Sequence, residues 1–222
     1  GATRWLNIAG VSFQPSELAK YVIVFFLAMM IDKYGGISKN WKIPLIYLAS
    51  AAIFALLVYK ENNLSIASII MIVAFIMVFV SGMSIKEACT LIGTGGILGT
   101  VGIFSAQYRI DRFVSFLNPW KYADKEGYQL VHSLYAIGSG GLFGVGLGNS
   151  KQKALYMPEP HNDFIFAIIG EELGLIGCIA VIAIFVVLIV AGIKVASRAK
   201  DRYGKLLATG IISVIAVQAI IN

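Results

Sequence analysis

LGLIGCIAVIAIFVVLIVAGI, residues 173–193, consists of aliphatic, aromatic and small side chains and carries no charge. A helix needs about 20 mainly apolar residues to cross the hydrocarbon core of a bilayer, so this stretch is long enough to span it. The composition of the whole chain agrees, because 58% of its residues are hydrophobic and only 14% are charged. Soluble domains are about 45–50% apolar and about 25% charged. We therefore expect an integral membrane protein.

Further apolar segments on both sides of this stretch have the length of membrane spans. The predicted spans are about 15–31, 44–59, 64–80, 85–104, 164–193 and 206–222. The first begins at Pro15 with Glu17 in its first turn, which suits proline and the positive end of the helix dipole. The fourth is rich in glycine, which we expect to permit close contacts between helices. The predicted fold is all-α, a polytopic transmembrane helix bundle with about six spans.

The last apolar run stops at Asn222 without a flanking anchor, and residue 1 is not methionine. We therefore expect residues 1–222 to be a fragment of one membrane domain, with spans missing at both ends. The cysteines and histidines do not have the spacing of a disulfide framework or a metal site. The net charge of +6 comes from basic residues at the ends of apolar segments. This distribution indicates membrane topology, and we expect no nucleic-acid partner.

Two short loops predict the orientation of the spans. The loop after the first span and the loop before the last are basic, and they contain Lys33, Lys39, Lys42, Lys194, Arg198, Lys200, Arg202 and Lys205. An excess of lysine and arginine in short loops is typical of the cytoplasmic side. Residues 105–163 then form a long extracytoplasmic loop. Because this loop is rich in aromatic residues, we expect it to be structured, with short interfacial helices and a re-entrant one near residues 129–138.

Carboxylates at the outer ends of two spans are the first candidates for a site. Glu17 and Lys20 are three residues apart and share a helix face, so a structural ion pair and a substrate contact both stay open. Asp163 begins the fifth span, where an ordinary helix cap is the alternative to a functional carboxylate. Asp163 shares a small, polar face with Ala167, Gly170, Glu171 and Gly174, which we expect to point into the bundle. Of Glu171 and Glu172, we expect only one to face inwards.

A set of cations is predicted on the same outer side: Arg4, Lys20, Arg109, Arg112, Lys151 and Lys153. Together they could bind the pyrophosphate group of a lipid, although each alone is typical of a headgroup anchor. The glycine run at residues 138–148 lacks the preceding strand and the spacing of a dinucleotide-binding motif. It instead predicts tight turns and close backbone contacts. These residues alone fit a transporter as well as an enzyme.

Several motifs go further, because they resemble the SEDS (shape, elongation, division and sporulation) proteins, the FtsW/RodA/SpoVE family. The similar segments are GATRWL at 1–6, FQPSELAK at 13–20, YR at 108–109, FLNPW at 116–120, GYQ at 127–129 and SLYAIGSGG at 133–141. The most specific are HNDFIFA at 161–167 and GEELG at 170–174. They cover nearly the whole chain in the family's order. Asn162 and the run GVGLGNSKQK at 144–153 resemble the FtsW and SpoVE branch more than RodA.

The resemblance implies a multi-pass protein of the bacterial plasma membrane with about ten spans in full. It implies a peptidoglycan glycosyltransferase that polymerises lipid II at the outer face, for division or sporulation. Asp163 matches the family's essential outer-loop aspartate and is expected to be the catalytic base. Undecaprenyl pyrophosphate would leave with inversion at the donor sugar. The expected substrate-binding residues are Arg4, Trp5, Glu17, Lys20, Arg109, Arg112, Lys151 and Lys153.

The resemblance also implies partners, namely a class B penicillin-binding protein and the division or sporulation machinery. No cofactor is established by the sequence, and a divalent cation, Mg²⁺ or Mn²⁺, between Asp163 and pyrophosphate stays open. A lipid II flippase and a non-catalytic scaffold are the alternative functions. A flippase should carry polar groups through the midplane. The predicted position of Asp163 and the cations outside the membrane favours the enzyme.

Overall fold

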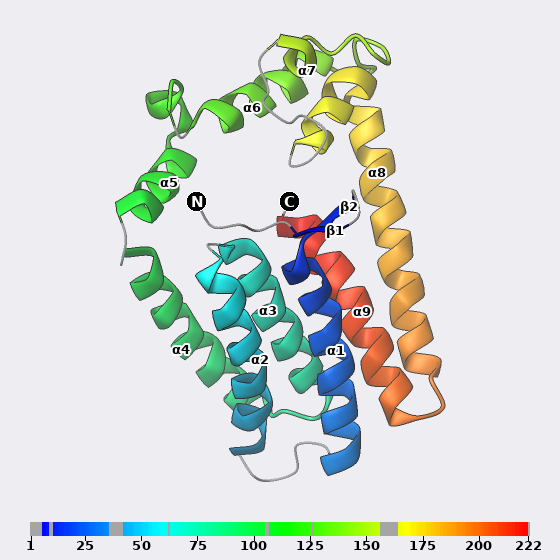
Figure 1. The fold of residues 1–222 in the computed structure, drawn as a ribbon. Coiled ribbons are helices and arrows are strands. Elements are labelled where there is room, and N and C mark those ends of the chain that lie inside the picture. Colours follow the sequence, from blue (N-terminus) through cyan, green and yellow to red (C-terminus); the bar gives the residue numbers. More distant parts are fainter. Residues whose placement is uncertain are drawn as a thin grey trace. The chain divides into compact units, whose positions relative to one another are not determined.

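The computed structural model describes residues 6–8, 11–35, 42–61, 63–104, 107–125, 127–155 and 164–221. Arg4, Trp5 and Asp163, which are predicted site residues, lie outside these ranges, as do the side chains of Arg109 and Arg112. The described residues are mainly helical, as predicted (Figure 1). The elements are β1 (Leu6–Ile8), β2 (Val11–Phe13), α1 (Pro15–Tyr34), α2 (Lys42–Lys60), α3 (Leu64–Val80), α4 (Ile85–Phe104), α5 (Gln107–Leu117), η1 (Pro119–Tyr122), α6 (Tyr128–Gly140), α7 (Lys151–Leu155), α8 (Ile165–Arg198) and α9 (Arg202–Ile221).

The six long helices α1, α2, α3, α4, α8 and α9 occupy the segments predicted as spans. By length and composition, α2, α8 and α9 are each able to cross a membrane, and α3 is a shorter apolar helix. The stretch between α4 and α8 contains the short helices α5, η1, α6 and α7 in its described part, which agrees with the predicted interfacial helices. A two-stranded antiparallel hairpin, with Leu6 opposite Phe13, was not predicted.

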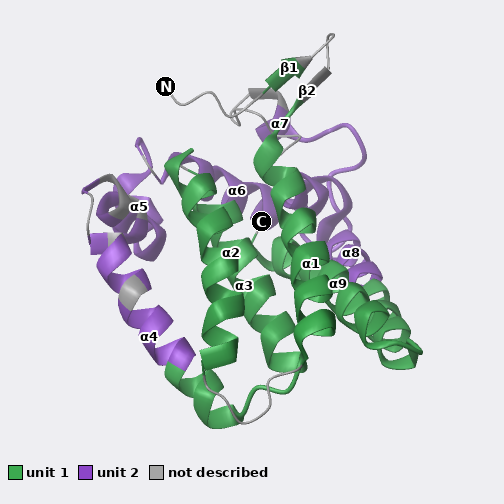
Figure 2. Ribbon diagram, turned by 60° about the horizontal axis from the view of Figure 1, so that its bottom comes forward, with its two compact units in different colours: residues 1–90, 187–221 green, residues 91–186, 222 purple. Residues whose placement is uncertain are grey.

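The chain divides into two compact units, shown in Figure 2. Unit 1 comprises residues 1–90 and 187–221, and unit 2 comprises residues 91–186 and 222. Unit 1 holds the main helix bundle, and unit 2 holds the short helices with residues 91–104 of α4 and residues 165–186 of α8.

In unit 1, α1, α2, α3 and α9 pack against one another. Both faces of α1 are apolar: Ile23 and Leu27 are fully buried, whereas Val22 and Met29 are half exposed. A helix that is apolar on all sides is typical of a membrane span, whose outer face contacts lipid. Gly210 of α9 permits a close contact, because an added Cβ would lie 2.5 Å from Val24 Cγ1 and 2.8 Å from Met77 Sδ.

In the described part of the chain, the glycines of α4 make no such close contact. A Cβ added at Gly93, Gly95, Gly96, Gly99 or Gly102 would meet no atom within 4 Å in the described part of the chain. The expectation that they permit close helix contacts therefore has no support among the described residues and stays a prediction. The close contacts occur at glycines whose neighbours belong to other segments, as at Gly210 in unit 1 and at Gly140 in unit 2.

Candidate functional site

Helix α8 is interrupted near its beginning, at Gly174. This residue has φ 67° and ψ −163°, which lies outside the helical region and in a region that only glycine occupies readily. The sequence predicted one continuous span over residues 164–193, and the structure corrects this. The first part of α8 ends at the Glu171–Glu172 pair and Leu173, and the long part begins at Leu175.

A break in a helix leaves carbonyl groups and N–H groups without their helical partners, and in a membrane these must be satisfied by protein. Here residues 141–150, which we call the glycine loop, supply the partners. Four backbone hydrogen bonds join them: Val145 N–H to Glu171 O at 2.9 Å, Gly146 N–H to Glu172 O at 3.1 Å, Leu175 N–H to Gly141 O at 2.9 Å and Ile176 N–H to Leu142 O at 3.3 Å. The glycine loop therefore supplies the hydrogen-bond partners that the backbone of α8 loses at the break.

Glycine is required where the loop and the helix meet. Gly144 has φ 80°, and an added Cβ would overlap the carbonyl of Glu172, lying 2.1 Å from its oxygen. A Cβ on Gly174 would lie 2.6 Å from the carbonyl carbon of Leu142, and one on Gly140 would overlap Gly170 O. The sequence-based expectation of tight turns and close backbone contacts in this glycine run is confirmed.

The side chain of Glu171 holds the far end of the glycine loop. Glu171 is only 2% exposed. Its Oε2 accepts hydrogen bonds from Ser150 Oγ at 2.5 Å and from Gln152 N–H at 3.4 Å, and its Oε1 accepts from Lys151 N–H at 3.0 Å. Ser150 Oγ in turn accepts from Lys153 N–H at 3.0 Å. The first three N–H groups of α7, which have no helical acceptors, are thus all satisfied. We call Glu171 and its three donors the Glu171 cluster.

Helix α6 is joined to the same cluster through α7. Gln152 Oε1 and His132 Nδ1 are hydrogen bonded at 2.8 Å. The His132 ring packs on Tyr128, with centroids 4.2 Å apart, and on Tyr135 at 5.9 Å. Tyr135 contacts Trp120 edge to face at 5.4 Å. This aromatic group gives unit 2 a continuous contact path from η1 through α6 to α7.

The two lysines predicted in this region differ in their surroundings. Lys151 is exposed, whereas Lys153 Nζ lies 3.9 Å from Glu172 Oε1. The Lys153 side chain is 39% exposed and that of Glu172 is 12% exposed. Glu171 and Glu172 are thus both largely covered, because the glycine loop and α7 pack over this part of α8. Ala167, Gly170, Glu171 and Gly174, which were predicted to share one inward face, are all buried, and Gly170 and Gly174 lie against α6 and the glycine loop.

Unit 1 contains a second polar cluster, around Lys20. Lys20 is 0% exposed, and its Nζ donates to Glu17 Oε2 at 2.6 Å and to Gln218 Oε1 at 2.5 Å. The expected pair of Glu17 with Lys20 is therefore present, and it joins α1 to the end of α9. Sequence reasoning missed Gln218, although it is the only amide side chain in the apolar run at residues 206–221. Buried polar groups in membrane helices usually pair in this way.

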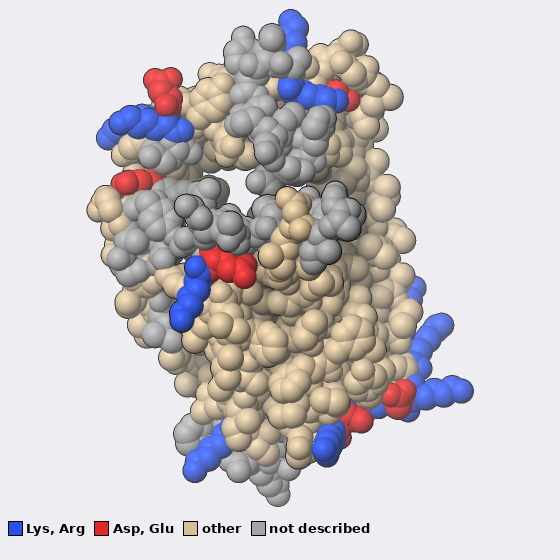
Figure 3. Space-filling model, viewed as in Figure 1, with Lys and Arg blue, Asp and Glu red and all other residues tan. Residues whose placement is uncertain are grey.

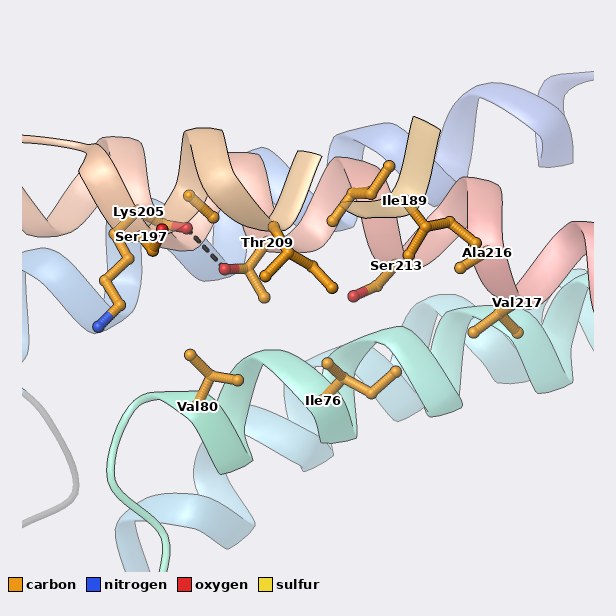
Figure 4. A pocket seen from close by; sticks show the side chains of 12 residues that line it. Ile76, Val80, Ile189, Ser197, Lys205, Thr209, Ser213, Ala216 and Val217 are labelled. Carbon is orange, nitrogen blue, oxygen red and sulfur yellow. Dashed lines mark hydrogen bonds between the residues drawn. The ribbon is translucent and has the colours of Figure 1, made fainter. Parts of the chain in front are cut away.

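Among the residues that the structure describes, no three His, Cys, Asp or Glu side chains come together as a metal site. The divalent cation left open by the sequence would lie at Asp163, which is outside the described residues. Unit 1 also holds a cavity of about 390 Å³ between α3, the end of α8 and α9. Figure 4 shows its lining, which is apolar except at Ser197, Thr209, Ser213 and Lys205. It contains none of the predicted site residues.

Curated relatives match the chain over its whole length. The chain is 41% identical to the stage V sporulation protein E of Bacillus subtilis, covering 100% of this chain and 61% of that protein. It is 38% identical to the probable peptidoglycan glycosyltransferase FtsW of Methylomonas methanica, covering 100% of this chain and 58% of that protein. The chain thus spans about three-fifths of the length of these relatives.

Solved structures share the fold. The rod shape determining protein RodA of Thermus thermophilus matches with a TM-score of 0.58 and 22% identity, over 99% of this chain and 56% of that one. A chain described under "Structural coordination of polymerization and crosslinking by a peptidoglycan synthase complex" matches with a TM-score of 0.76 and 20% identity, over 99% and 61%. At these identities the likeness establishes the fold alone.

The family described as "Cell cycle protein", comprising FtsW, RodA and SpoVE, has a sequence model that matches residues 1–222. Together with the apolar helices and the relatives above, this match identifies a multi-pass membrane protein. The chain belongs to the FtsW/RodA/SpoVE family.

Proposed function

We propose that the full-length protein is a peptidoglycan glycosyltransferase that polymerises lipid II at the outer face of the plasma membrane, in division or sporulation. The names of the relatives support this class of activity. The observation that carries the proposal is that α7 and α8, the helices that precede and follow residues 156–163 in the chain, are bonded to each other. The helix before this segment, α7, is bonded to Glu171, and the helix after it, α8, contains Glu171.

In the proposed reaction, the 4-hydroxyl oxygen of an acceptor sugar attacks the anomeric carbon of the donor. The bond from that carbon to the pyrophosphate oxygen breaks, and undecaprenyl pyrophosphate leaves with the electron pair. The hydroxyl proton passes to the carboxylate of Asp163. A single displacement inverts the configuration, so one general base suffices.

Pyrophosphate is a good leaving group, which needs neutralisation of its charge more than protonation. We assign this contribution to Arg109, Arg112, Lys151 and Lys153, of which Lys151 and the half-exposed Lys153 are accessible in the structure. Lys20 is already bonded to two acceptors. We therefore propose that Lys20 holds α1 to α9 and affects the substrate through that packing.

A class B penicillin-binding protein is the proposed partner, because polymerised strands must be cross-linked. The similarity in fold to a chain of a peptidoglycan synthase complex supports this partner. The other two assignments, a flippase and a non-catalytic scaffold, have no structural observation in their favour among the described residues.

The test is a lipid II polymerisation assay on the full-length protein, purified with its penicillin-binding partner. Asp163→Asn should lower the rate by about 10²–10⁴-fold, as expected for loss of a general base. The matched control is Asp201→Asn. Asp201 caps α9, and its Oδ2 accepts a hydrogen bond from Gly204 N–H at 2.8 Å. This variant should retain wild-type activity, because asparagine is as good a cap as aspartate.

Two results would refute the proposal. Normal polymerisation by a folded Asp163→Asn variant would exclude the base assignment. A wild-type protein that makes no glycan but moves lipid II between the leaflets of vesicles would replace the enzyme with the flippase.

A further inference from the structure

We propose that the cavity between α3, the end of α8 and α9 binds an anionic phospholipid, with an acyl chain inside the cavity and the phosphate at the basic turn between α8 and α9. The residues that line the cavity all belong to unit 1. The lipid would come from the leaflet on the side of this turn, which the charge pattern predicts to be cytoplasmic. This inference does not rest on the proposed function.

The lining of the cavity fits a hydrocarbon chain. Its volume is about 390 Å³, and small-molecule sites usually measure about 300–1,000 Å³. Aliphatic side chains of three helices form its walls, for example Ile76 of α3, Ile189 of α8 and Val217 of α9. Such walls offer water few hydrogen bonds, which favours an apolar occupant. Because the surrounding bilayer is equally apolar, selectivity for one lipid has to come from its headgroup.

The cavity extends over about the depth of one leaflet. Its lining follows α9 from Lys205 to Val217, a rise of about 18 Å at about 1.5 Å per residue. Half of the hydrocarbon core of a bilayer is about 15 Å thick. Figure 4 shows Lys205 and Ser197 at one end of the cavity, and Ala216 and Val217 at the other. An acyl chain along α9 would therefore reach from the headgroup level to about the midplane.

Positive charge is concentrated at the Lys205 end. A hollow at the turn between α8 and α9 is lined by three exposed cations, Lys194, Arg198 and Lys200. The carboxylate of Asp201 lies in the same hollow, where it caps α9 by accepting from Gly204 N–H at 2.8 Å. With Lys205, four cations thus surround one carboxylate. This surplus of positive charge is complementary to a lipid phosphate.

Membrane topology accounts for a basic turn, but it does not require a cation on the wall of a cavity. Lys205 lies in the first turn of α9, where the positive end of the helix dipole disfavours a cation. Helix stability therefore does not account for Lys205 either. The hydroxyls at this end, Ser197 and Thr209, donate within their own helices, to Lys194 O at 3.0 Å and to Lys205 O at 2.8 Å. The phosphate would therefore be bound by the charged side chains.

The test measures lipid binding to the full-length protein in detergent by native mass spectrometry. The probes are phosphatidylglycerol, which is anionic, and phosphatidylcholine, which is zwitterionic. Lys205→Gln should weaken the binding of phosphatidylglycerol by about fivefold, the effect of one cation near a membrane phosphate. It should leave phosphatidylcholine unchanged. The matched control is Lys33→Gln, because Lys33 is an exposed lysine in the last turn of α1 and outside the lining of the cavity.

A second variant, Ala216→Phe, tests the position of the acyl chain. Ala216 is partly exposed at the apolar end of the cavity, so a phenyl group would fill that end and leave the charges intact. Phosphatidylglycerol should bind about tenfold more weakly, because its chain loses packing contacts. The unfolding temperature in lipid-free detergent checks the fold of each variant. If Ala216→Phe fails to fold, a short-chain phosphatidylglycerol, which should also bind wild type about tenfold more weakly, tests the same point.

Four results would overturn the proposal. Equal binding of the two lipids by wild type would exclude recognition of the negative charge. Equal losses in Lys205→Gln and Lys33→Gln would show attraction by overall charge instead of a site. Unchanged lipid binding by a fully stable Ala216→Phe variant would place the acyl chain elsewhere. If this variant instead loses stability without a change in lipid binding, a protein segment occupies the cavity.

Discussion

Replacing Gly174 with alanine should separate the glycine loop from the break in α8. The residue occupies φ 67° and ψ −163°, where a non-glycine residue costs about 1–3 kcal/mol. Its new Cβ would lie 2.6 Å from the carbonyl carbon and oxygen of Leu142, so the glycine loop has to move away. The bonds from Leu175 N–H and Ile176 N–H to this loop would be lost, at about 0.5–1.5 kcal/mol each. The expected destabilisation is about 2–6 kcal/mol.

Cys178 provides a local probe of this opening. It lies one turn after Gly174, is 7% exposed and carries a free thiol. Cys89 is exposed and must be replaced by serine, together with any cysteine elsewhere in the full-length protein. In detergent, below the unfolding temperature, the rate at which a thiol-reactive dye labels Cys178 should rise by about 30-fold or more, since about 1.4 kcal/mol corresponds to tenfold in an opening equilibrium.

The matched control is Gly95→Ala in α4. A Cβ there would meet no atom within 4 Å in the described part of the chain, and alanine favours a helix. Labelling of Cys178 in this variant should match that of the unmodified protein. If Gly174→Ala also labels at the unmodified rate, with the same unfolding temperature, the left-handed glycine is not required and the account of the break is wrong.

Two further substitutions test the packing of unit 1. Lys20→Met should lower the free energy of unfolding by about 1–3 kcal/mol, a range that allows for solvent around the half-exposed Glu17. Thermal unfolding measures the change, with substitution of the exposed Lys33, Lys33→Met, as the control. An unfolding temperature equal to that of Lys33→Met would show that the pair contributes nothing. Gly210→Ala should lower stability by about 1–3 kcal/mol, because its Cβ would overlap Val24 and Met77. The same measurement applies, and an unchanged or raised unfolding temperature would contradict the close packing of α1, α3 and α9.

The helices could be predicted from the sequence because each long apolar run needs a membrane to solvate it. The interruption of α8 could not, since residues 173–193 are apolar throughout and glycine is tolerated inside membrane helices. What identifies Gly174 as a break is its pairing with the glycine loop, some 30 residues earlier in the chain. Such a contact between distant segments has no local signal. The predicted glycine turns and the break in α8 therefore belong to the same contact between these two segments.

The polar clusters were predictable in part. The spacing of Glu17 and Lys20 placed them on one helix face, but their third partner, Gln218, belongs to a helix that only the tertiary fold brings near. Glu171 was predicted to face inwards, and the structure adds its donors from the glycine loop and α7. Asp163, Arg4 and Trp5 lie outside the described residues and stay predictions.

The distribution of charge bears on the choice between enzyme and flippase. In the described long helices, charged residues lie in the first two or the last two turns, as Lys20 does in α1 and Glu171 and Glu172 do in α8. On the face seen in Figure 3, charged side chains accordingly lie mainly towards the ends of the helices. The centres of α1 and α3 are buried apolar residues such as Ile23, Leu27 and Val73.

A charged headgroup that crosses the bundle would need polar partners along its path. Within the described part of the chain, the buried carboxylate of Glu171 and the buried ammonium of Lys20 are each already bonded to protein partners. Releasing either one would leave its partners unsatisfied in a region of low polarity, which is strongly unfavourable. These groups are suited to hold helices and loops in place. Among the described residues, this arrangement agrees with the proposed chemistry at one surface of the membrane.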